Sequence, residues 1–108
     1  MTTAKRFTKE ESQQIASTIL EQLGGNKFLA MTGAKNLAFG DGSLQFNIGR
    51  NGSKANTVVI ELTPADLYTV TFFQFRKMEL KELKKFEGVF FDMLQDIFTD
   101  YTGLYTSL

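Results

Sequence analysis

The sequence predicts an α+β fold, in which an antiparallel sheet of four to five strands is packed by an N-terminal helix and a long C-terminal helix. Two observations lead to this prediction. Apolar residues recur at helical spacing near the two ends of the chain, whereas short β-branched or alternating runs separated by glycine-containing turns fill the middle. With 108 residues, of which 43% are hydrophobic, the chain is expected to form one domain, residues 1–108, whose core needs neither disulfide nor metal.

The first helix is expected to begin after Thr8. Thr8 can accept a hydrogen bond at the start of the helix, and Glu11 completes a capping box with it. Gly24 and Gly25 are expected to end the helix, because glycine readily adopts the left-handed conformation that a helix end requires. Residues 1–7 are expected to be flexible. The apolar face of this helix is formed by Ile15, Ala16, Ile19, Leu20 and Leu23.

Five short runs are expected to be strands, and they span residues 27–32, 36–39, 43–48, 57–62 and 69–77. Gly40, Asp41 and Gly42 predict a tight hairpin turn. The alternation of apolar and polar residues in 43–48 is typical of a half-buried strand, and the β-branched run 57–62 predicts a central strand.

Two further features lie between the strands and in the last of them. Residues 63–66 (TPAD) resemble a helix start, with a cap, a proline and an acid, so one short helical turn is expected there. The strand 69–77 is apolar on both faces, with Phe73 and Phe75 on one and Val70 and Phe72 on the other. Both faces of this strand are therefore expected to be covered.

The last helix is expected to span about residues 79–102 and to end at Gly103. Its apolar face would comprise Leu83, Phe86, Phe90, Met93, Leu94, Ile97 and Tyr101. The two helices are expected to cover one face of the sheet. The predicted core consists of Leu20, Leu23, Leu44, Phe46, Ile60, Phe86, Phe90 and Ile97.

The composition argues against catalysis. The chain contains 11 phenylalanines but no histidine and no cysteine, so it lacks the usual proton shuttle, the usual thiol nucleophile and the two commonest transition-metal ligands. We therefore predict that the protein is not an enzyme, and we assign no catalytic residue, cofactor or metal ligand.

Two patterns that could bind ions have simpler structural interpretations. Asp92, Asp96 and Asp100 follow one helical stripe and could bind a divalent cation, but hard cations usually bind ligands that converge from a loop or from several elements. A solvated helix face is the preferred interpretation. Residues 32–35 (TGAK) lack the longer glycine-spaced run of a phosphate-binding loop, so a structural turn is preferred.

Phe91 and Phe98 are the candidate interaction surface. They are spaced by seven residues and lie beside the apolar face of the predicted last helix, which makes that face wider than one sheet requires. Either the C-terminal tail or a partner would cover them. The partner would be an unidentified protein or a second copy in a homodimer.

A basic surface is the candidate for nucleic-acid contacts. Residues 27–77 contain six basic and three acidic residues, and hence a net charge of +3, although the 12 basic and 12 acidic residues of the whole chain balance. If strand aromatics faced outward beside these bases, the sheet could stack single-stranded nucleic acid. The bases are Lys27, Lys35, Arg50, Lys54, Arg76 and Lys77.

Four short sequence motifs carry a resemblance to other proteins: 23–28 (LGGNKF), 31–36 (MTGAKN), 62–68 (LTPADLY) and 102–108 (TGLYTSL). Together they resemble small proteins of unknown function encoded by bacteriophages and by integrated mobile elements of bacteria. The resemblance implies a setting in the bacterial cytoplasm but no activity, cofactor or site residue. In that family the strand near residues 72–75 is more polar than it is here.

These observations lead to one principal hypothesis and two alternatives. The first is a non-enzymatic phage or mobile-element protein that acts through protein–protein interaction in the cytoplasm of a bacterial host. No run of about 18 apolar residues predicts a membrane span, and the N-terminus lacks the apolar region of a signal peptide. The alternatives are a small nucleic-acid-binding module and a small enzyme of unfamiliar type.

Overall fold

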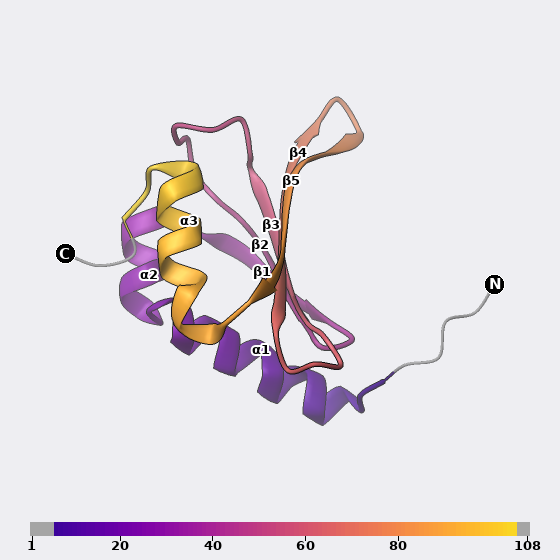
Figure 1. The fold of residues 1–108 in the computed structure, drawn as a ribbon. Helices are drawn as coiled ribbons and strands as arrows, with labels where there is room; N and C mark the ends of the chain where they lie inside the picture. The colour runs from indigo at the N-terminus through magenta and orange to yellow at the C-terminus, as the bar shows by residue number, and fades with distance from the viewer. Residues whose placement is uncertain (1–5, 106–108) are drawn as a thin grey trace.

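The computed structural model describes residues 6–105, which form an α+β fold. Five antiparallel strands form a sheet in the order β1-β2-β3-β4-β5, and the helices pack on one face of it (Figure 1). The elements are α1 (Lys9–Leu23), α2 (Asn26–Thr32), β1 (Lys35–Gly40), β2 (Ser43–Asn47), β3 (Thr57–Leu62), β4 (Tyr68–Arg76), β5 (Glu79–Val89), the 3₁₀ helix η1 (Phe91–Met93) and α3 (Leu94–Thr102).

The first helix confirms the prediction. The Thr8 hydroxyl accepts a hydrogen bond from Glu11 N (3.1 Å), and the Glu11 carboxylate accepts one from Thr8 N (2.8 Å). At the other end the N–H of Gly24 bonds to the carbonyls of the last turn, with φ at 127°. Residues 1–5 of the segment expected to be flexible lie outside the described residues, and Arg6 and Phe7 donate backbone hydrogen bonds to Asp41.

Residues 27–32 form helix α2 rather than the predicted strand. Phe28 and Thr32 are both buried at helical spacing, and the Thr32 hydroxyl donates to the Phe28 carbonyl (2.7 Å). Gly33 ends the helix in the left-handed conformation. With only seven residues, the segment is too short for its helical period to stand out from a short apolar strand.

The strands in the middle of the chain follow the prediction, but the expected helical turn at residues 63–66 is wrong. Leu62 pairs with Tyr68, so β3 and β4 form a hairpin. Thr63 N donates to the Leu67 carbonyl (2.8 Å) and Asp66 takes a positive φ of 61°. Strand pairing across the hairpin leaves this loop too short to form a helix.

The long C-terminal helix is the largest error of the sequence prediction. Its first half is strand β5, and only η1 and α3 are helical. Two irregularities in the β4–β5 register lengthen β5 by extra residues, so that Leu83, Phe86 and Val89 follow one another every three residues. This spacing imitates a helical face.

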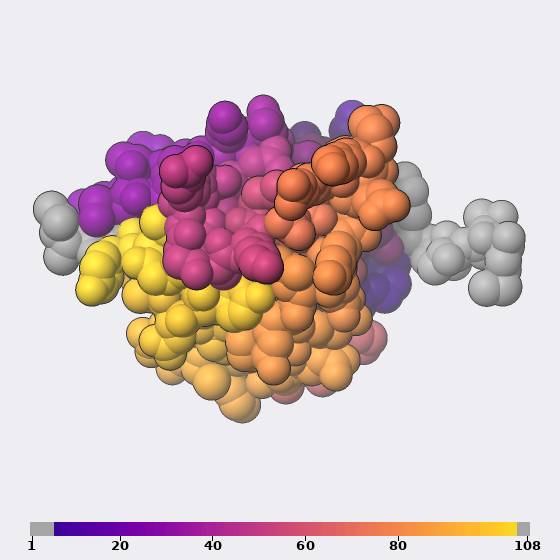
Figure 2. Space-filling view, turned by 90° about the horizontal axis from the view of Figure 1, so that it is seen from above, coloured from indigo at the N-terminus to yellow at the C-terminus, as the bar shows by residue number. Residues whose placement is uncertain are grey.

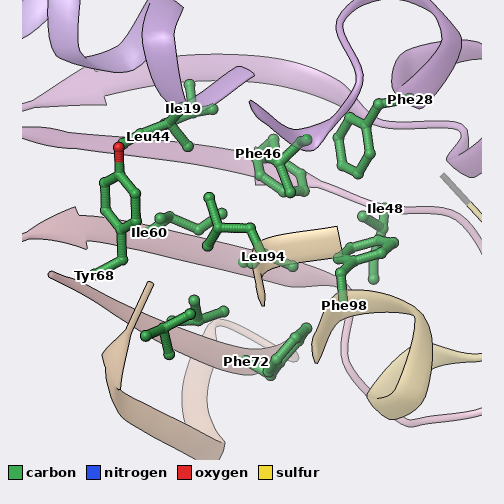
Figure 3. Packing of buried hydrophobic residues seen from close by; sticks show 14 of the residues in the cluster. Ile19, Phe28, Leu44, Phe46, Ile48, Ile60, Tyr68, Phe72, Leu94 and Phe98 are labelled. Atoms are coloured by element: carbon green, nitrogen blue, oxygen red, sulfur yellow. The ribbon is translucent and has the colours of Figure 1, made fainter. Parts of the chain in front are cut away.

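The core lies between the sheet and the helices (Figure 3). The rings of Phe28 and Phe98 are 5.1 Å apart, those of Phe28 and Phe46 are 5.3 Å apart, and Phe72 lies 6.3 Å from Phe98. All four rings are buried, and the edge-on packing of Phe28 against Phe46 and Phe98 stabilises such an aromatic cluster. Of the predicted core residues, Phe90 is wrong, because it is exposed at the junction between β5 and η1.

The helices cover only one face of the sheet within the described residues. On β4, Val70 and Phe72 face the helices, whereas Phe73 and Phe75 face the other side. Phe73 is half buried and Phe75 is exposed. The expectation that both faces of this strand are covered is therefore wrong for this part of the chain.

Candidate functional site

A groove with a volume of ≈ 400 Å³ lies between α1 and the edge strand β1. Ala16 and Leu44, which are buried, and Leu20, which is half buried, form its apolar lining. Leu37 and Phe39 of β1 also line it, and each of them is 41% exposed. The groove therefore offers apolar surface beside a strand at the end of the sheet.

The N-terminus of α1 is fixed to the turn between β1 and β2. The Asp41 carboxylate accepts hydrogen bonds from the backbone N–H groups of Arg6 and Phe7, both at 2.9 Å. The Ser12 hydroxyl accepts one from Gly42 N (3.2 Å). Gly42 has a φ of 72°, and a Cβ on it would lie 2.6 Å from the Phe7 ring. These contacts hold α1 against β1 and so give the groove a defined shape.

The direction of the backbone groups in β1 follows from the hydrogen bonds of its neighbour β2. Leu62 N donates to the Gly42 carbonyl (2.9 Å), and Ile48 N donates to the Asn56 carbonyl (3.0 Å). Along an antiparallel strand these groups alternate from side to side. The even-numbered residues of β2 therefore direct their backbone groups to β3, and the odd-numbered residues direct theirs to β1.

The same alternation leaves two residues of β1 facing outward. Ala38 and Gly40 pair with odd-numbered residues of β2, so their backbone groups are directed into the sheet. Phe39 directs its groups away from the sheet, and so does Leu37, which adjoins Ala38 at the end of the register irregularity. Within residues 6–105 the sheet has no further strand on this side. Phe39 pairs with Leu44, a core residue, so its side chain lies on the helix side. Free backbone groups and apolar side chains thus meet along one edge.

The opposite edge of the sheet, β5, has a different character. Six of its 11 residues are charged, and two register irregularities interrupt its pairing with β4. Charges and bulges are the devices by which proteins prevent unwanted strand pairing at a sheet edge. In β1 only Lys35 is charged. The pairing of β1 with β2 has one register irregularity as well, between Lys35 and Ala38, so residues 37–40 are the uncharged part of this edge that an added strand could pair with.

The structure separates the two residues of the predicted interaction surface. Phe98 is 1% exposed and lies in the aromatic core, so its assignment to a surface is wrong. Phe91 is 61% exposed and lies beside the exposed Phe90 and Met93. Leu83, Phe86 and Phe90, which defined the centre of the predicted face, lie outside the helix. The buried face of α3 therefore follows its own residues and runs through Leu94 and Phe98.

Four of the six predicted nucleic-acid contacts gather at one end of the sheet. Arg50 and Lys54 lie in the β2–β3 loop, and Arg76 and Lys77 lie in the β4–β5 hairpin. Asn56 links the two segments: its side chain donates to the Phe75 carbonyl (2.8 Å) and accepts from Phe75 N (2.8 Å). Figure 2 looks onto this end of the molecule.

Of the other two bases, Lys35 lies at this end of the sheet and Lys27 lies apart from it. Lys35 begins β1 at the same end of the sheet, opposite Asn47. Lys27 lies in the first turn of α2. The other end of that helix, at Thr32, is the end that contacts the β2–β3 loop, where the Thr32 carbonyl accepts a hydrogen bond. The structure therefore places Lys27 apart from the main basic cluster.

The tip of the β4–β5 hairpin is strained and apolar. Lys77 and Met78 have φ values of 52° and 64°, a conformation that costs non-glycine residues roughly 1–2 kcal/mol each. Met78 is 89% exposed, and Phe75 and Leu80, which pair across the hairpin, are exposed as well. The hairpin thus presents apolar and basic side chains together.

For the remaining candidates from the sequence, the geometry supports either a structural role or no role. Asp92, Asp96 and Asp100 are exposed, and no three acidic residues within 6–105 are grouped as metal ligands. Gly33 ends α2, so residues 32–35 form a turn. Burial raises the pKa of Tyr68 above its ordinary value of 10.0, and a side-chain hydrogen bond with Gln22 offsets part of this rise.

Comparisons with known proteins add no family to this description. No family model matches the chain, and neither the curated proteins nor the solved structures yielded a match. Among the described residues, no helix is both long enough and apolar enough to cross a membrane.

Sequence reasoning missed the groove and the β1 edge. One signal was present: residues 36–40 carry no charge, whereas residues 79–87 are rich in charges. This contrast becomes meaningful only once both segments are recognised as the two edges of one sheet.

Proposed function

We propose that this protein is a non-enzymatic binding protein that accepts an extended strand of another protein chain along β1. The observation that carries the proposal is the uncharged free edge of β1 beside an apolar groove. In strand addition, backbone hydrogen bonds supply affinity and pockets for alternate side chains supply specificity.

The chemistry of the added strand follows from the site. Its backbone would pair with Leu37 and Phe39, and two apolar side chains, two residues apart, would enter the groove near Ala16 and Leu20. Lys35 and Asp41 lie at opposite ends of β1. An antiparallel strand would therefore place a basic residue near Asp41 and an acidic residue near Lys35.

We place this activity in the cytoplasm of a bacterial host. The support is the resemblance of four segments of the chain to proteins encoded by phages and mobile elements. The absence of histidine and cysteine supports binding rather than catalysis.

Peptide binding tests the proposal. The probe is a fluorescein-labelled synthetic peptide that begins with lysine, alternates threonine with leucine and phenylalanine, and ends with aspartate. Fluorescence polarisation measures its affinity at low protein concentration. Introducing charges with Leu37→Lys and Phe39→Lys is expected to weaken binding at least about tenfold, which is about 1.4 kcal/mol.

The matched control is the variant with Phe90→Lys and Met93→Lys. It adds the same charge to another exposed apolar surface and should bind the peptide like the unaltered protein. A scrambled peptide that binds equally well would contradict the proposal, as would equal losses in both double variants.

Nucleic-acid binding is a second candidate function, favoured by the gathering of Arg50, Lys54, Arg76 and Lys77 at one end of the sheet. A polarisation titration with a labelled DNA duplex at two salt concentrations tests it. The variant with Arg76→Gln and Lys77→Gln should reduce the slope of log K against log salt by about 2, given about 0.9 per phosphate contact.

The control for this titration is the variant with Lys9→Gln and Lys27→Gln, which removes the same charge from the helices and should leave the slope unchanged. Absence of salt-sensitive binding at low ionic strength would rule out this second function.

A further inference from the structure

We infer that the strand accepted at β1 is β1 of a second copy of this chain, so that two copies join through their β1 edges into one continuous sheet. This inference rests on the proposed function, since it names the partner of the same site. It requires that β1 be complementary to itself when two copies are related by a two-fold axis.

Two copies of β1 can pair in several registers, and the backbone of β1 favours one of them over the two registers with the axis shifted by one residue. Only Leu37 and Phe39 direct their backbone groups outward. With the two-fold axis at Ala38, Leu37 of each copy lies opposite Phe39 of the other, and both pairs exchange hydrogen bonds. A two-fold axis at Leu37 or at Phe39 leaves only one such pair, because the opposing residue is then Lys35, which pairs with Asn47, or Asp41, which lies in the turn.

The side chains of β1 are complementary in the same register. Leu37 and Phe39 lie on the groove side, so each copy would bring two further apolar side chains to the groove of the other copy. Lys35 at one end of the strand would lie near Asp41 of the second copy at the other end. The site requires a ligand with a basic residue, two alternate apolar residues and an acidic residue. The chain itself has this pattern at Lys35, Leu37, Phe39 and Asp41.

The rest of the chain fits this arrangement. The 12 basic and 12 acidic residues balance, so no net repulsion opposes the approach of two copies. In the joined sheet both outer edges are β5, the edge protected by charges and bulges. The assembly is therefore closed, because no β1 edge is left to pair with a third copy.

A single cysteine tests the register directly, because the chain has none of its own. Ala38 of the two copies would face each other as a non-hydrogen-bonded pair, with Cα atoms about 4.5 Å apart, a separation that permits a disulfide. Ala38→Cys is therefore expected to form a covalent dimer on mild oxidation. Gln45→Cys is the control: it lies beside Ala38 on β2, is equally exposed and is one strand away from the axis.

Sedimentation of the cysteine-free chain completes the test. We expect a dimer at high protein concentration that Leu37→Lys with Phe39→Lys converts to a folded monomer, with circular dichroism confirming the fold. A monomer that still binds the synthetic peptide would overturn this inference and leave the proposed function standing. A dimer that survives the double variant, or equal crosslinking of both cysteine variants, would also overturn it.

Discussion

The two edges of the sheet have opposite designs. Strand β5 carries six charged residues among 11 and two register irregularities. Strand β1 has one charge, at Lys35, and one irregularity, and it presents Leu37 and Phe39 beside an apolar groove. Exposed strand edges attract other strands, so proteins normally protect them. The contrast is what the proposed function requires, because the charges lie along β5 and residues 37–40 of β1 carry none.

The contrast depends on the helical layer beneath β1. Helix α1 lies against β1 and β2, where the bonds from Arg6, Phe7 and Gly42 hold its start. The pocket beside Glu79 and Lys81 of β5 is lined by residues of the β4–β5 hairpin, with no helix residue among those that line it. The β1 edge and the groove therefore form one site. Loss of either should remove the preference of an added strand for β1 over β5.

The largest expected effect comes from breaking the helix–sheet packing. Phe98→Ala should lower the free energy of unfolding by about 3–5 kcal/mol, because it empties the centre of the aromatic core. Urea denaturation measures this. Phe91→Ala is the control and should change stability by no more than about 0.5 kcal/mol, since the side chain is exposed. Similar losses in both variants would contradict the assignment of Phe98 to the core.

The next largest effect is expected on stability when alanine replaces either of two glycines with positive φ, one near each edge of the sheet. Gly42→Ala should destabilise the protein by more than the roughly 1–2 kcal/mol of backbone strain, because its Cβ would also meet the Phe7 ring at 2.6 Å. Gly88→Ala, in β5, carries similar strain with nothing within 4 Å of the new Cβ. The difference between the two unfolding free energies isolates the contact that fixes α1 to the β1 turn. Equal values would show that this contact is unimportant.

A third prediction removes the protection of β5. The variant with Glu79→Thr, Lys81→Thr, Glu82→Thr and Lys85→Thr keeps the net charge and breaks only an exposed ion pair of 3.9 Å, worth up to about 1 kcal/mol. Its outer edges should then add further strands, and light scattering should detect species larger than a dimer. If the variant stays as small as the unaltered protein, the charges of β5 do not protect the edge.

The smallest effect concerns Tyr68, whose pKa burial raises above 10.0. The hydroxyl is protonated in both states below the unfolded pKa, so it does not change stability there. As the pH rises above 10.0 and through the folded pKa, the unfolded state ionises first and the free energy of unfolding falls. Tyr68→Phe should reduce this alkaline loss in urea titrations at several pH values. An identical decline in the variant would contradict the burial of this hydroxyl.

Local signals in the sequence were sufficient for part of the fold. The capping box of Thr8 and Glu11 predicted the start of α1, and the alternation at Leu44 and Phe46 predicted β2, because both features act over a few residues. The bulges of β5 could not be read in this way. They change the strand period at Leu83, Phe86 and Val89 to one that imitates a helix.

The error in β5 also displaced the predicted site. With Leu83, Phe86 and Phe90 counted as part of the helix, Phe98 fell beside the predicted apolar face, whereas the face of α3 alone includes Phe98 in the core. The groove at Leu37 and Phe39 depends on which strands end the sheet, and strand order is set by contacts between distant residues. A single sequence shows the uncharged run but not its position at an edge.

Amide hydrogen exchange along β1 tests the central claim most directly. The account predicts that the outward N–H groups of Leu37 and Phe39 become protected as protein concentration rises, while the free edge of β5 remains unprotected at every concentration. Exchange at Leu37 and Phe39 that is independent of concentration, and independent of the added synthetic peptide, would contradict it.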